Sequence, residues 1–184
     1  MVFIQAINKN IWPFYLKPKH DELFTSWIYR MAIKSNTKPI PFVKSCFGKE
    51  SSFWNRDIDL IIPSKIIDKT IKHTPLKKAD IIKMSLKTYE GFAFESIKLN
   101  SRNLNIGSIG INHRKRQKYG LVYCPICVKQ NYYRTSWRLL TSLICVKCNQ
   151  YLLDRCGKCY SPISFHRINI GNKNQNKGKV VLLL

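Results

Sequence analysis

Residues 124–159 read CPICVKQNYYRTSWRLLTSLICVKCNQYLLDRCGKC, and this stretch decides the fold of the carboxy-terminal part of the chain. It contains three Cys-x-x-Cys pairs. Two residues between two thiolates let the chain turn so that both sulfurs reach one tetrahedral metal ion. The paired residues are Cys124, Cys127, Cys145, Cys148, Cys156 and Cys159. Because cysteine pairs in the reducing cytosol bind metal rather than form disulfides, the stretch predicts a zinc module.

The first two pairs predict a closed zinc site. Seventeen residues separate Cys127 from Cys145, a spacing typical of four-cysteine zinc sites. Four thiolates leave no open position for water, so we expect the Zn²⁺ ion to be structural rather than catalytic.

The third pair allows two interpretations. It follows Cys148 by seven residues, and no fourth pair follows it. Cys156 and Cys159 either hold a second, incompletely ligated ion, for which His166 is the nearby nitrogen ligand, or one of the three pairs is spare. A closed site built from the second and third pairs is the alternative to the one described above.

The first two thirds of the chain contain periodic apolar residues that predict helices. Residues 23–32 carry apolar side chains at spacings of one, three and four. Asp21 and Glu22 are expected in the first turn of this helix, where negative charge suits the helix dipole. A second apolar stripe spans residues 42–47 and includes Cys46, which we interpret as core packing. The two stripes together suit a helix-turn-helix.

A second pair of helices is predicted further along the chain. Pro63 to Ile71 places isoleucines on one face. The dipeptide Thr74-Pro75 is typical of an N-cap and a first-turn proline, and predicts a helix that continues to Leu86. The expected fold class is therefore mainly α-helical with a small zinc-ribbon module.

The predicted organisation has four parts. A helix-turn-helix-like helical domain spans 1–95 and is followed by a basic connector over 96–120. A Cys-rich zinc-finger module spans 121–168, and a flexible tail covers 169–184.

The composition indicates a polyanionic partner. The 184 residues include 32 Lys and Arg against 10 Asp and Glu, a formal net charge of +22. Such an excess favours nucleic acid, because each neutralised phosphate releases counterions. An AT-biased genome explains part of the Lys content, since Ile and Asn are also abundant. No apolar run is long enough to span a membrane and no signal peptide is recognised, so we expect a cytoplasmic protein.

The basic run at 113–118 is the first candidate for contact with phosphate groups. Its expected contacts are Arg114, Lys115, Arg116 and Lys118. Point charges on a loop suit phosphate rather than base edges, so we expect binding that does not read the base sequence. A solvated loop without a ligand is the alternative interpretation.

Four motifs follow one another along the chain. They are Pro18 with Asp21-Glu22, Ser26-Trp27 and Arg30; Asp57-Ile-Asp59 with Pro63; the stretch Met84 to Gly91; and the cysteine segment with Tyr123, Tyr133-Arg134, Trp137-Arg138 and Leu152-Leu153. In order and spacing they resemble the TniQ/TnsD family of transposon target-selection proteins. The chain departs from that family at Cys148, where His is usual, and in lacking a further cysteine pair. Without that further pair, a second metal ion lacks a full set of cysteine ligands.

The resemblance implies a non-enzymatic protein that acts before the transposase. Members of the family mark a target, either by binding DNA or by docking on a CRISPR-associated effector complex. They then recruit an AAA+ ATPase that delivers the transposase. With 184 residues the chain is similar to the compact members associated with RNA-guided transposition. We expect no small-molecule substrate, and a location at the bacterial nucleoid.

The region around Asp21, Glu22 and Arg30 is the candidate docking surface for the ATPase. We expect its exposed face to carry charges of both signs, which favours a protein partner over phosphate alone. Trp27 on the same helix is expected in the core. Trp137 is expected to pack against the cysteine pairs, because so small a module has little else to bury.

Two other functions compete with the adaptor. A stand-alone zinc-containing DNA-binding regulator would share the charge and the metal. A metal-dependent nuclease would use Asp57 and Asp59 to hold Mg²⁺, although no third carboxylate is evident. The structural interpretation of this pair is hydrogen bonding in a loop or capping at the following turn.

Overall fold

The computed structural model describes residues 10–48, 53, 56–98, 103–109, 119–158 and 160–163. The α-helices are α1 (Phe24–Lys34), α2 (Pro39–Phe47), α4 (Ser64–His73) and α5 (Lys78–Lys83). Three short 3-10 helices follow, η1 (Leu86–Tyr89), η3 (Cys127–Gln130) and η4 (Ser136–Arg138), and then strands β1 (Ile144–Cys145) and β2 (Gln150–Tyr151). This content confirms the predicted fold class, mainly helical with a small cysteine-rich module.

Several predicted features lie outside the described residues. They are Arg114, Lys115, Arg116, Lys118, Cys159, His166 and the tail 169–184. Their predicted roles stay predictions.

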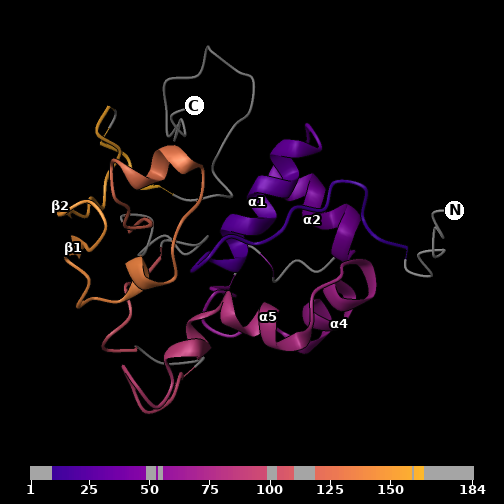
Figure 1. Ribbon diagram of the computed structural model, residues 1–184, viewed down its shortest axis with the longest axis horizontal. Coiled ribbons are helices and arrows are strands. Elements are labelled where there is room, and N and C mark those ends of the chain that lie inside the picture. The colour runs from indigo at the N-terminus through magenta and orange to yellow at the C-terminus, as the bar shows by residue number, and fades with distance from the viewer. Residues whose placement is uncertain are drawn as a thin grey trace, which may run out of the picture.

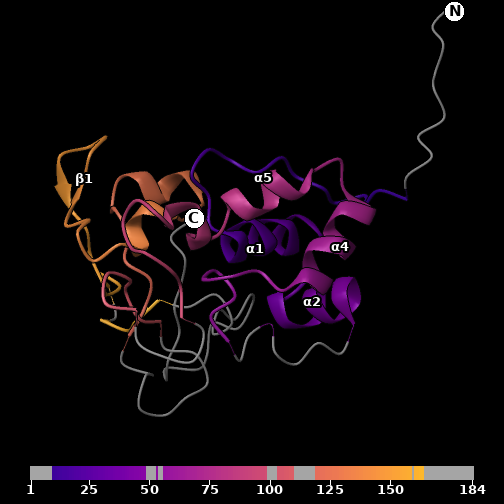
Figure 2. The same cartoon turned by 90° about the horizontal axis from the view of Figure 1, so that it is seen from below.

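The helical half is built around α1, which lies between α5 and α2 (Figure 2). Its side chains of Phe24, Trp27 and Met31 are fully buried. They pack with apolar residues of the neighbouring helices in one cluster, in which the Phe24 and Trp27 rings lie 5.6 Å apart. Trp27 is therefore a core residue, as expected. Cys46 packs against the same cluster, as the sequence predicted.

Two helix boundaries differ from the prediction. The first helix begins at Phe24, so Asp21 and Glu22 precede it and do not lie in its first turn. The last helix begins at Lys78 rather than at Pro75. The Thr74 hydroxyl donates to the Thr70 carbonyl at 2.7 Å, at the end of α4.

The start of α5 is set by a different residue. The Asp80 carboxylate accepts the Lys77 amide at 2.9 Å, which fixes the first turn there. Leu86 is buried, but it belongs to η1 and not to the preceding helix.

The cysteine-rich half lies beside the helices and contains little regular structure (Figure 1). Its two strands form an antiparallel pair in which Ile144 faces Tyr151. Its buried cluster contains cysteines and aromatic residues together with Leu23 and Tyr29, which come from the helical half. The two halves therefore share a core.

The described helices are short, and the longest of them, α1, has 11 residues. None of them combines the length and the apolar character needed to cross a bilayer.

Candidate metal centre and the junction around it

Four cysteine sulfurs meet at one point of the cysteine-rich half. The Sγ atoms of Cys124, Cys127, Cys145 and Cys148 all lie within 4.8 Å of one another. Four Zn–S bonds of about 2.3 Å in a tetrahedron place the sulfurs about 3.8 Å apart. Cys127 Sγ lies 3.7 Å from Cys145 Sγ and 3.3 Å from Cys148 Sγ, so the group fits a tetrahedral ion. The four cysteines could hold a metal ion, and they are the four that the spacing predicted.

In both cysteine pairs of this cluster, the turn points backbone amides at a sulfur. The amide of Cys127 donates to Cys124 Sγ at 3.4 Å. In the second pair, the amides of Lys147 and Cys148 donate to the Cys145 sulfur. Amide donors of this kind stabilise thiolates, the form that binds metal.

Cys156, the described residue of the third pair, does not join this group. Among the described residues the four-sulfur cluster is the only group of three or more possible metal ligands, and Cys156 is not in it. Cys156 is buried in the shared core. Cys145 and Cys148 face the first pair, and Cys159, the other residue of the third pair, lies outside the described residues.

Aromatic residues cover the cluster. Trp137 is 4% exposed and belongs to the same core as the cysteines, which confirms its predicted packing. Its ring stands edge-on to the Tyr133 ring at 6.1 Å. Burial raises the pKa of Tyr133 far above its ordinary value, so this phenol stays neutral.

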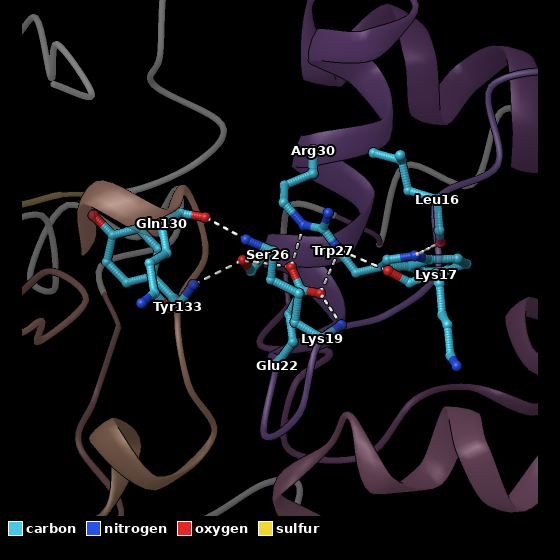
Figure 3. A network of polar contacts seen from close by, with 9 residues as sticks. All are labelled: Leu16, Lys17, Lys19, Glu22, Ser26, Trp27, Arg30, Gln130 and Tyr133. Atoms are coloured by element: carbon cyan, nitrogen blue, oxygen red, sulfur yellow. Dashed lines mark hydrogen bonds and ion pairs between the residues drawn. The ribbon is translucent and has the colours of Figure 1, made fainter. Parts of the chain in front are cut away.

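In the acidic pair of the first motif, Glu22 lies inside the protein, whereas Asp21 is half-buried. Glu22 is 1% exposed. Its two carboxylate oxygens accept Nε and Nη2 of Arg30, each at 2.7 Å, and one of them also accepts the Ser26 hydroxyl at 3.2 Å (Figure 3). The expected exposure is therefore wrong for Glu22. Glu22 can be buried because its charge is neutralised by the paired Arg30.

The first helix and the cysteine-rich half are joined by hydrogen bonds. The Leu23 amide donates to the Tyr133 carbonyl at 2.9 Å, and the Tyr133 amide donates to the Ser26 hydroxyl at 2.9 Å. Figure 3 shows the second of these bonds, with Lys19 reaching the Gln130 carbonyl beside it. We call these contacts, together with those of Asp21, Asp57 and Asp59 below, the junction.

Asp21 caps a helix that belongs to the other half. Its backbone has a positive φ of 59°, which turns the carboxylate towards η4. That carboxylate accepts the Ser136 amide at 3.3 Å and the Ser136 hydroxyl at 2.5 Å, and it also contacts the Thr135 hydroxyl. Since η4 has no side-chain cap of its own, Asp21 satisfies its free amino-terminal donors.

Asp59 does the same for α1. Its carboxylate accepts the Thr25 amide at 2.9 Å and the Thr25 hydroxyl at 2.5 Å. The N-cap residue of α1, Leu23, has no side-chain oxygen, so this remote aspartate supplies the cap. Burial, aided by the neighbouring Asp57, raises the pKa of Asp59 to about 6, although Arg138 and Thr25 oppose the shift.

Asp57 pairs with an arginine of the cysteine-rich half. It accepts Nη1 and Nη2 of Arg138 at 3.2 and 2.5 Å. Both acids of the Asp57-x-Asp59 motif are thus engaged in hydrogen bonds, which supports the structural interpretation of the pair. The helix that is capped is the distant α1 and not the following turn.

Sequence comparison gives one family. The chain matches the TniQ family over residues 13–152. No curated protein matches it. The matched span contains the four cysteines of the cluster and all residues of the junction.

Proposed function

Because this chain belongs to the TniQ family, we propose that it is a target-selection adaptor of DNA transposition without catalysis of its own. The TniQ domain supports a role associated with transposition. In the proposed role, the protein links a target-marking complex to an AAA+ ATPase that delivers the transposase. The target-marking complex is a CRISPR-associated effector ribonucleoprotein, the target DNA, or both. In this role the protein acts at the nucleoid, in the cytoplasm.

The proposed metal is one structural Zn²⁺ per chain. Thiolate sulfurs are soft ligands that suit zinc, and four of them close the coordination shell. The distances between the four sulfurs support this assignment. When bound, the ion holds the turns of residues 124–127 and 145–148 together, and it offers no position for a reacting water.

The observation that carries the adaptor role is the internal use of the acidic side chains. Asp21, Glu22, Asp57 and Asp59 each accept hydrogen bonds from other groups of the protein. A magnesium-dependent nuclease needs carboxylates that face a substrate and a metal. The pair that such an enzyme would use is instead committed to Arg138 and to the start of α1.

Nucleic acid is the second proposed partner. The net charge of +22 supports contact with phosphate, and the run with Arg114, Lys115, Arg116 and Lys118 is its proposed site. Removal of three of these charges should lower the slope of log affinity against log salt by about 0.9 for each lost phosphate contact on duplex DNA. An unchanged slope would mean that the run is solvated and makes no contact.

The proposed surface for the ATPase is a groove beside the start of α1. It has a volume of about 1050 Å³. Exposed Lys17, Lys19, His20 and Lys83 line it together with apolar side chains and with Asp21 and Glu22. The acidic pair and Arg30 hold the segment that forms one wall. The partner therefore contacts the basic rim, while these three residues keep the rim in place.

The test of this role is complex formation. The zinc-loaded protein is mixed with the cognate ATPase, ATP and DNA, and the complex is measured by light scattering and pull-down. Lys17→Glu with Lys83→Glu should weaken the complex at least tenfold. Lys72→Glu, an exposed lysine of α4 outside the groove, is the matched control and should leave it unchanged. Absence of any complex, together with tight binding to one DNA sequence, would favour the DNA-binding regulator.

A further inference from the structure

Three arginines lie in or against the junction, and two of them hold a carboxylate. Arg30 is paired with Glu22, and Arg138 with Asp57. The third, Arg134, is only 5% exposed. Within the described part of the chain, its Nε and Nη2 have no hydrogen-bond partner, and both nitrogens are buried. Arginine stays charged in proteins, so this is a buried cation with two unused donors.

The surroundings of Arg134 stabilise its charge without accepting its N–H bonds. Its Cζ lies 4.9 Å from the ring centre of Tyr132 and 5.7 Å from that of Trp137. The ammonium of Lys19 lies 4.7 Å from the same Tyr132 ring. Aromatic faces attract cations, but a buried N–H donor still loses its bond to water. Two positive charges thus share one aromatic ring, and among the described residues no carboxylate forms an ion pair with either.

The titration of Lys19 agrees with a shortage of negative charge. Burial lowers the pKa of Lys19, and the guanidinium groups of Arg30 and Arg134 lower it further. Glu22 opposes the shift, but both of its oxygens are already bonded to Arg30.

The geometry of the unused donors defines the ligand. Nε and Nη2 form one edge of the guanidinium, with two parallel N–H bonds that match two oxygens of a carboxylate or a phosphate. Arg30 uses this same edge to bind Glu22. Arg134 presents the edge without the oxyanion.

We propose that Arg134 is the centre of an oxyanion-binding site, in which its Nε–Nη2 edge holds two oxygens of one carboxylate or phosphate group and Lys19 supplies a second positive charge. Because both nitrogens are buried, the phosphates of a DNA duplex cannot reach them. The ligand is therefore a small free ion or an acidic side chain of a bound protein. Lys19 is exposed, and its side chain can swing aside on a nanosecond timescale to admit the ligand.

The experiment compares three proteins with two probes. The zinc-loaded full chain, Arg134→Lys and Arg56→Lys are unfolded thermally in chloride and in phosphate at equal ionic strength. Arg134→Lys keeps the charge but loses the edge, and Arg56→Lys changes an exposed arginine in the same way. At ten times the dissociation constant, phosphate should raise Tm by about 3–6 °C. The rise should occur in the wild type and in Arg56→Lys but not in Arg134→Lys.

A blocked tetraglutamate peptide, used in the same way, separates the two sources of the oxyanion. An Arg134-dependent response to phosphate at the lower concentration identifies a free ion. A response to the peptide at the lower concentration identifies an acidic side chain. Equal responses of all three proteins to both probes would overturn the proposal, since they would reflect net charge alone.

A second readout does not depend on the folding of a variant. The Nε–H signal of Arg134 in a ¹H–¹⁵N spectrum is the one that disappears in Arg134→Lys, and it should shift when either probe is added to the wild type. If no arginine Nε–H signal of the wild-type protein moves at saturating probe, Arg134 is held by its aromatic neighbours alone and the proposal is wrong.

Discussion

The helical half and the cysteine-rich half are stabilised by different kinds of interaction. The helical half buries a continuous apolar cluster, in which Phe24, Trp27, Ile28 and Met31 have no exposed surface. The cysteine-rich half has two-residue strands and short 3-10 helices, and its cluster is built on cysteines and aromatic rings. This cluster also includes Leu23 and Tyr29 of the helical half.

This contrast teaches what each half depends on. Burial of apolar area stabilises a helical core through many small contributions. A module that buries little depends on a few strong interactions, here the proposed ion and the buried polar contacts of the junction. The changes below test this contrast, from the largest expected effect to the smallest.

Loss of the metal should have the largest effect, and on one half only. Structural zinc contributes about 10–16 kcal/mol of apparent binding free energy in zinc-finger peptides. Cys124→Ser should therefore remove the tightly held ion and the near-ultraviolet dichroism of the cysteine-rich half. The far-ultraviolet signal of the helices should remain, at a lower Tm because the shared core is opened. Metal analysis and circular dichroism measure these effects.

Cys46→Ser is the matched control for metal loss. Cys46 lies in the helical half, and burial raises the pKa of its thiol to about 12, so it is not a thiolate ligand. This variant should keep one zinc per chain. Full zinc retention by Cys124→Ser would contradict the assigned site.

Truncation of a side chain in the apolar core should destabilise the helical half and leave the metal site intact. Trp27→Ala removes a fully buried ring and its 2.7 Å hydrogen bond to the Leu16 carbonyl. The expected cost is about 4–5 kcal/mol, measured by urea unfolding. The helical signal should fall while zinc stays bound at low temperature. Ile40→Ala, at a half-exposed position of α2, should cost less than about 0.5 kcal/mol. Zinc loss from Trp27→Ala in native buffer would show that the halves do not differ as described.

Breaking one ion pair of the junction should affect both halves together. Asp57→Ala removes the carboxylate that is hydrogen-bonded to the Arg138 side chain, which is 2% exposed, and leaves only Asp59 at 3.9 Å from it. We expect a loss of about 3 kcal/mol in the free energy of unfolding, because the buried guanidinium loses its two hydrogen bonds to a carboxylate. The double variant Asp57→Leu with Arg138→Met should recover most of this loss. If Asp57→Ala alone is neutral, the junction does not couple the two halves.

The smallest effect concerns pH. The pKa of Asp59 is about 6 in the folded protein against an ordinary value of 3.8. Since the folded state binds this proton more tightly, its contribution to stability is complete below pH 4 and is lost as the pH rises through 6. The change is at most about 3 kcal/mol, spread over this pH range. Asp59→Asn should flatten the dependence of the urea midpoint on pH between 4 and 7, compared with the wild type.

The comparison with the wild type is needed because thiolate protonation releases zinc in the same pH range. The asparagine side-chain oxygen still accepts the hydrogen bond from the Thr25 amide. The Thr25 hydroxyl can then accept a hydrogen bond from the asparagine NH₂ group instead of donating one. Parallel curves for the two proteins would contradict the assigned titration.

The sequence predicted local features well. Apolar periodicity gave the first helix, and the spacing of cysteines gave the four that meet, because both signals come from residues close in sequence or from strict metal geometry. The start of the first helix was predicted too early. Acidic residues before a helix suggest its first turn, but here Asp21 and Glu22 have partners elsewhere.

The junction could not be predicted from the sequence. Nothing in the local pattern of Asp59 shows that it caps α1, since Thr25 is 34 positions away. Arg138 could have been flagged, because a cysteine-rich module with so few acids near it must find a partner for a buried arginine in the other half. The exposure expected for Glu22 was wrong for the same reason. Its partner Arg30 is only eight positions away, but the Ser26 hydroxyl that donates to Glu22 also accepts the amide of Tyr133, far along the chain.

The long reach of the junction bears on how the protein is made. The bond between Ser26 and Tyr133 joins residues 107 positions apart, and that between Asp21 and Ser136 joins residues 115 apart. A ribosome that adds about 5–20 residues per second needs roughly 5–20 seconds to cover that distance. During this delay the Glu22–Arg30 pair, eight positions apart, can already form, while the Leu23 amide and the Asp21 carboxylate wait for their acceptor and donors. The junction therefore closes only after the cysteine-rich half has been made, and translation sets the order in which its bonds form.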